Sequence, residues 1–62
     1  MGRKEIIDTI AKLSRSQGFY GRLLMSILQA EQDDPDSYNA YMEELENQNF
    51  RSTLELVVYL EG

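Results

Sequence analysis

Hydrophobic residues recur along the chain with helical spacing from its first residues. Between positions 3 and 15, apolar side chains follow the i, i+1, i+4, i+7 pattern that places them on one face of a helix. They are Ile6, Ile7, Ile10 and Leu13. Charged residues fall opposite, and Asp8 and Lys12 have the spacing of a favourable i, i+4 pair. The pattern predicts an amphipathic helix near residues 4–15.

The next segment is more hydrophobic. In a helix over residues 19–32, apolar side chains would cover about half of the circumference. They are Phe19, Tyr20, Leu23, Leu24, Ile27 and Leu28. Because a helix this apolar is normally covered on several sides, we expect it to be the central helix. A turn near 15–18 separates it from the first helix. There Gly18 would end the first helix in a left-handed conformation, or Ser16 would cap the second.

Asp34 and Pro35 mark the start of a third helix, near residues 35–47. Asp34 suits the N-cap position and Pro35 the first helical position. One narrow face carries Tyr38, Tyr41, Met42 and Leu45. Glutamates flank this apolar stripe, so we expect the helix to lie on the surface, with the stripe forming either core or a dimer seam.

The last segment fits two structures. Ser52 and Glu55 have the spacing of a capping box, with Phe50 just outside as a hydrophobic staple, and these features favour a helix near residues 52–61. The alternation of Leu54, Leu56, Val58 and Leu60 is instead typical of a strand. A strand here would have to pair across a dimer, because no second strand is predicted in the chain. We therefore predict a helix.

These elements predict an all-α fold, a compact orthogonal bundle of four short helices in a single domain over residues 1–62. The apolar content of 42% is that of an ordinary globular chain. A core this small supplies only about 3–5 kcal/mol of net stability. The chain has no cysteine to form a disulfide and no histidine to help bind zinc, so helix packing or association must stabilise it.

Charge is distributed unevenly. Residues 1–22 contain five of the six basic residues and two of the eleven acidic ones, so their net charge is +3. Residues 23–62 contain one basic and nine acidic residues, so their net charge is −8 and the total is −5. This acidity argues against non-specific nucleic-acid binding. Either the basic half faces an acidic partner, or the acidic half faces a basic one, or both are solvated surfaces.

The residue types present argue against an enzyme. Without histidine or cysteine, acid–base work would fall to carboxylates on exposed, acidic helix faces, and a chain this small has little room for a substrate pocket. A calcium loop starting at Asp34 would need glycine and glutamate where Asn39 and Leu45 stand. We therefore expect no cofactor, no metal and no small-molecule substrate. No apolar run is long enough for a membrane span, and we expect a cytoplasmic protein.

The most distinctive stretch runs from Ser16 to Arg22. On one interpretation, Gly21 lets a neighbouring helix approach and Phe19 is buried. On the other, a basic and aromatic surface patch binds a protein partner, because tyrosine and arginine often anchor interfaces. The candidate residues of this patch are Arg15, Tyr20 and Arg22.

Residues 16–24 and 48–61 resemble small uncharacterised helical proteins of bacterial phages and mobile elements. The resemblance implies a helical fold and an accessory role, and it assigns no site residues. From the residues and this resemblance we expect a non-enzymatic protein–protein interaction module that binds a protein partner or associates with itself. The alternatives are a helix-turn-helix-like DNA-binding or transcription-regulating accessory protein and an acidic mimic of nucleic acid.

Overall fold

The computed structural model describes all 62 residues and contains four helices and no strand. The helices are α1 (Arg3–Leu13), α2 (Gly18–Asp33), α3 (Pro35–Asn47) and α4 (Thr53–Glu61). The radius of gyration is 11.0 Å, close to the about 10.6 Å expected for a compact chain of this length. The predicted all-α bundle of four short helices is confirmed, and each predicted boundary lies within two residues of the observed one.

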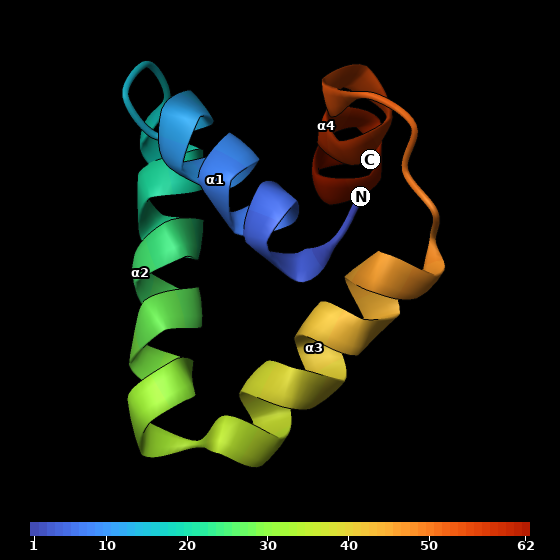
Figure 1. Cartoon of the computed structure of the whole chain (residues 1–62). Helices are drawn as coiled ribbons and strands as arrows, with labels where there is room; N and C mark the ends of the chain where they lie inside the picture. The colour runs from blue at the N-terminus through green and yellow to red at the C-terminus, as the bar shows by residue number, and fades with distance from the viewer.

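The helices α2 and α3 diverge from a tight junction at Asp34 like the arms of a V (Figure 1). Helix α1 packs against both arms, and α4 lies toward the open end of the V. The chain is therefore a set of crossing helices rather than a parallel bundle.

Two side-chain caps fix the starts of α3 and α4. Asp34 accepts a hydrogen bond from the backbone N–H of Ser37 (3.4 Å), and Pro35 is the first residue of α3, as predicted. The hydroxyl of Ser52 accepts from the backbone N–H of Glu55 (3.3 Å). The Glu55 carboxylate accepts in turn from the backbone N–H of Arg51 (2.9 Å), one residue before the position a capping box would use.

The core draws on all four helices and on the loop before α4. It consists of Ile6, Ile10, Tyr20, Ile27, Tyr38, Met42, Leu45, Phe50 and Leu56. Most of the apolar stripe of α3 is thus core, the first of its two interpretations, and Tyr41 is half-buried beside it. At the edge of this core, Arg3 links α1 to α3. Its guanidinium donates a hydrogen bond to Asn39 (2.9 Å) and forms an ion pair with Glu46 (3.1 Å).

The second helix contacts α1 and α3, as expected of a central helix, but less of its apolar surface is covered than predicted. Only Tyr20 and Ile27 of α2 are fully buried, and these residues lie seven positions apart on one narrow seam. Phe19, Met25 and Leu28 lie outside this seam and are 43%, 72% and 43% exposed. A chain of 62 residues has too few elements to cover an apolar arc that spans half of a helix.

The turn between α1 and α2 also differs from both predictions. Gly18 does not adopt a left-handed conformation and is the first residue of α2, and the N-cap residue is Gln17, without a side-chain cap. The Ser16 hydroxyl donates to the carbonyl of Leu13 (3.3 Å), so it closes the end of α1 instead of capping α2. The left-handed residue of the chain is Asn49, with φ 55°, just after α3.

Residues 53–61 form a helix, which confirms the preferred prediction over the dimer-paired strand. Leu56 is fully buried, whereas Leu54 and Val58 are 70% and 61% exposed. Alternate residues therefore point to different sides, as helical geometry requires. Two tyrosine hydroxyls hold the helix to the rest of the chain: Tyr20 donates to Glu61, and Tyr59 donates to Glu44 (3.2 Å).

Candidate functional site

One of the three residues of the predicted basic and aromatic patch does not lie at the surface. Arg15 and Arg22 are exposed, but the Tyr20 side chain is fully buried and its hydroxyl donates to the Glu61 carboxylate. Burial, this hydrogen bond and the negative charge of Glu61 raise the pKa of Tyr20 to about 12. Tyr20 is therefore a core residue that ties α2 to α4, and it cannot anchor a partner at the surface.

The structural interpretation of the same stretch fails as well. A Cβ atom added at Gly21 would meet no atom within 4 Å, so no neighbouring helix approaches there. Phe19, expected in the core, is 43% exposed and packs its ring edge-on against Tyr20 (centroids 5.1 Å apart). Tyr20, which one interpretation placed at the surface, is buried, and Phe19, which the other placed in the core, is exposed. Tyr20 and Ile27 are seven residues, or two helical turns, apart, and this spacing could have indicated that Tyr20 faces the core.

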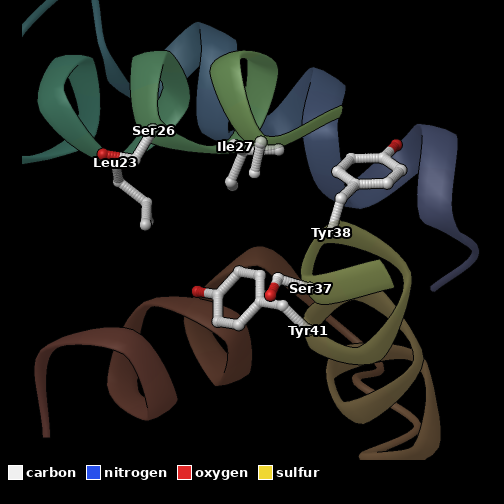
Figure 2. A pocket seen from close by; sticks show the side chains of 7 residues that line it. Leu23, Ser26, Ile27, Ser37, Tyr38 and Tyr41 are labelled. Carbon is white, nitrogen blue, oxygen red and sulfur yellow. The ribbon is translucent and has the colours of Figure 1, made fainter. Parts of the chain in front are cut away.

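An apolar groove lies between the two arms of the V and was not predicted. It has a volume of about 290 Å³ and is open to solvent. Figure 2 shows side chains of α2 and α3 facing one another across it, with Tyr41 pointing into the space between the arms. The lining consists of Leu23, Ser26, Ile27 and Ala30 from α2 and Ser37, Tyr38 and Tyr41 from α3.

The groove exists because of how the helices are joined and which side chains face inward. The junction at Asp34 holds α2 and α3 together at one end while they diverge toward the other (Figure 1). Three of the lining residues, Ser26, Ala30 and Ser37, are too small to fill the space between the diverging arms. Apolar walls that no other part of the chain covers are typical of surfaces that bind another molecule.

Two tyrosines beside the groove, Tyr41 and Tyr59, have raised pKa values and stay uncharged at neutral pH. Burial raises the pKa of Tyr41 above its ordinary value, and the neighbouring Tyr59 and the carboxylate of Glu44 raise it further. The pKa of Tyr59 is raised by desolvation and by its hydrogen bond to Glu44. The groove therefore presents neutral hydroxyls and apolar carbon, with the Glu44 carboxylate at its edge.

A second apolar surface lies on α4 and is called the α4 patch below. It consists of Leu54, Val58 and Tyr59 with the ring of Phe50, whose edge packs against Tyr59 (centroids 5.4 Å apart). The patch borders a hollow of about 440 Å³. Because Tyr59 also bonds Glu44 of α3, the α4 patch reaches the edge of the groove.

The remaining side chains suggest neither metal binding nor a membrane span. No group of three or more carboxylates is placed to hold a metal ion. None of the helices combines the length and the apolar character that crossing a membrane requires.

No protein-family model matches the chain, and no curated protein or solved structure is significantly similar to it. The resemblance to small proteins of phages and mobile elements therefore stays a prediction.

Proposed function

We propose that the protein is a non-enzymatic interaction module of the cytoplasm that binds a helical segment of a partner protein in the groove between α2 and α3. The observation that carries the proposal is the open apolar groove whose partly exposed wall residues are Leu23, Ala30 and Tyr41. Amphipathic helices bind such grooves by inserting side chains spaced at i, i+3, i+4 and i+7.

The dimensions of the groove favour a helix as its occupant. The α2 wall runs from Leu23 to Ala30, and Phe19 lies one turn before Leu23 on the same side of the helix. From Phe19 to Ala30 this strip is about 17 Å long at the α-helical rise. A partner helix of about 12 residues matches that length, and its apolar side chains would fill the space that the small lining residues leave.

The surroundings of the groove favour binding over catalysis. Its polar groups are the hydroxyls of Ser26, Ser37 and two tyrosines, and the raised pKa of Tyr41 makes it a weaker acid than a free tyrosine. The chain supplies no histidine or cysteine as a base or nucleophile. The DNA-binding alternative finds little support, because α3 carries only acidic charges where a recognition helix would need basic ones.

A designed peptide can take the place of the partner helix in a binding test. The probe is a labelled 14-residue helix with leucines spaced at i, i+3, i+4 and i+7 and glutamines elsewhere, and its binding is followed by fluorescence anisotropy. Ser26→Trp, at an exposed lining position, should fill the groove and abolish binding. Met25→Trp introduces the same residue on the other side of α2, where the Met25 side chain is 72% exposed, and should leave binding unchanged. Equal binding by both variants would contradict the proposed site.

Self-association is a second candidate function, favoured by the α4 patch. Leu54 and Val58 are exposed side by side on consecutive turns of a short helix. Sedimentation equilibrium over a concentration series measures whether this patch pairs two copies. If the α4 patch pairs two copies, the wild-type chain should dimerise and the Val58→Glu variant should remain monomeric. A wild-type chain that stays monomeric at all concentrations would exclude self-association through this patch.

A further inference from the structure

The charges around the groove identify the kind of helix that it binds, an inference that rests on the function proposed above. From Leu23 to Phe50 the sequence contains seven carboxylates and no lysine or arginine. Only one of them forms an ion pair within the chain, the contact between Glu46 and Arg3 (3.1 Å). The hairpin of α2 and α3 that forms the groove therefore carries six carboxylates without a cationic partner.

Some of these carboxylates lie at the ends of the groove. Glu44 is one helical turn beyond Tyr41, and its carboxylate accepts the hydrogen bond from Tyr59 (3.2 Å). Asp33 is one turn beyond Ala30 at the junction of the arms, where Asp34 caps α3 next to Ser37. All three of these acidic residues are exposed, so their charges stay hydrated and available to a partner.

One basic residue lies near the α2 wall. Arg22 is one turn before Ser26, at the end of α2 that is far from the junction. From these charges we expect the electrostatic potential along the groove to be negative near the junction and near Glu44. It is less negative only beside Arg22. An acidic helix would be repelled over most of this length, whereas a basic helix would meet opposite charges at both ends of its apolar face.

We propose that the groove binds a basic amphipathic helix of a partner protein. Its apolar face packs against Leu23, Ala30 and Tyr41, and its lysines or arginines lie beside Asp33 and Glu44. These rim charges set the partner's register and its rate of association more than they set affinity, because they remain in water.

A second copy of the chain does not fit this surface as well. The basic helix of the chain is α1, and its apolar residues Ile6 and Ile10 are fully buried in the core. Two α2–α3 hairpins facing one another would bring their acidic surfaces together. The occupant is therefore a segment of another protein.

Three peptides with one apolar face and different polar faces test the charge preference. Each has leucines at i, i+3, i+4 and i+7, and the other positions are all lysine, all glutamine or all glutamate. The lysine peptide should bind about 10-fold or more tightly than the glutamate peptide at low ionic strength. The difference should shrink as salt screens the exposed charges.

Paired substitutions locate the attraction. The double substitution Asp33→Asn with Glu44→Gln should weaken binding of the lysine peptide by about 3- to 10-fold at low salt. It should leave binding of the glutamine peptide unchanged. The control is Glu5→Gln with Asp8→Asn, which removes two exposed carboxylates from α1, away from the groove. Equal weakening by the two pairs would show that net charge alone attracts the peptide and would overturn the inference.

The glutamine peptide separates failure of this inference from failure of the proposed function. Suppose that the glutamine peptide binds as tightly as the lysine peptide and that Ser26→Trp blocks its binding. The groove is then a docking site without a preference for basic helices, and only the charge inference is refuted. If none of the three peptides binds at millimolar concentration, the groove is not a docking site and both proposals are refuted.

Discussion

Replacing Leu56 or Leu54 by alanine removes the same atoms from two positions of α4 with opposite surroundings. Leu56 is fully buried and is the one core residue that α4 supplies, whereas Leu54 is 70% exposed. Truncation of a buried leucine costs about 2–5 kcal/mol, because transfer energy is lost and a cavity remains. Truncation of an exposed leucine changes stability by about 0.5 kcal/mol or less. We therefore expect the two variants to differ by about 1.5 kcal/mol or more.

The size of this effect relative to the whole fold decides how it will be seen. A chain of 62 residues has a total stability of only about 3–5 kcal/mol. Leu56→Ala should therefore remove a large part of it and lower the urea midpoint strongly, and Leu54→Ala should leave the midpoint close to that of the wild type. Far-ultraviolet circular dichroism against urea measures both midpoints. Similar losses in the two variants would refute the helical placement of α4, because a strand would put both leucines on one face.

Three further predictions concern the buried tyrosine, a cap and a glycine. The pKa of Tyr20 is raised to about 12, and an unfolded tyrosine titrates near 10. The folded state keeps its proton in this range while the unfolded state loses it, so stability should fall as pH rises from 10 to 12. In urea titrations, the stability of Tyr20→Phe should fall less over this pH range than that of the wild type. The same pH dependence in both proteins would contradict the raised pKa of Tyr20. Asp34→Ala removes the cap from Ser37 and should cost about 1 kcal/mol, whereas Asp34→Asn should cost much less. Gly21→Ala places a methyl group in open space within α2 and should stabilise by about 0.5–1 kcal/mol in thermal unfolding; destabilisation would mean a close contact there.

The helices were predictable because their signals are local. Asp34, Pro35 and Ser52 cap helices wherever the surrounding chain goes, and the structure places helix starts at or beside them. The helical spacing of Ile6 and Ile10 likewise identified two residues that are fully buried. These features depend on neighbours within one helical turn, which the sequence contains in full.

The groove and the exchange of Phe19 and Tyr20 were not predictable in the same way. Periodicity shows which side of α2 is apolar, but that side spans half of the helix, and only tertiary packing selects the seam that is covered. Tyr20 is selected because its hydroxyl reaches Glu61, which is 41 residues away in sequence. The groove depends on the angle at which α2 and α3 diverge, and no residue pattern fixes that angle. Its charges, in contrast, follow from the acidic composition of residues 23–62.

The attachment of α4 through distant residues has a consequence for the order of folding. Helices α1 and α2 pack against each other, as do α2 and α3, and such contacts between sequence neighbours form quickly. The bonds from Tyr20 to Glu61 and from the backbone nitrogen of Met1 to the carbonyl of Phe50 (2.9 Å) instead close long stretches of chain. We therefore expect α4 to join a partly assembled three-helix unit after the rate-limiting step. In stopped-flow measurements, Leu56→Ala should then accelerate unfolding and leave the folding rate nearly unchanged.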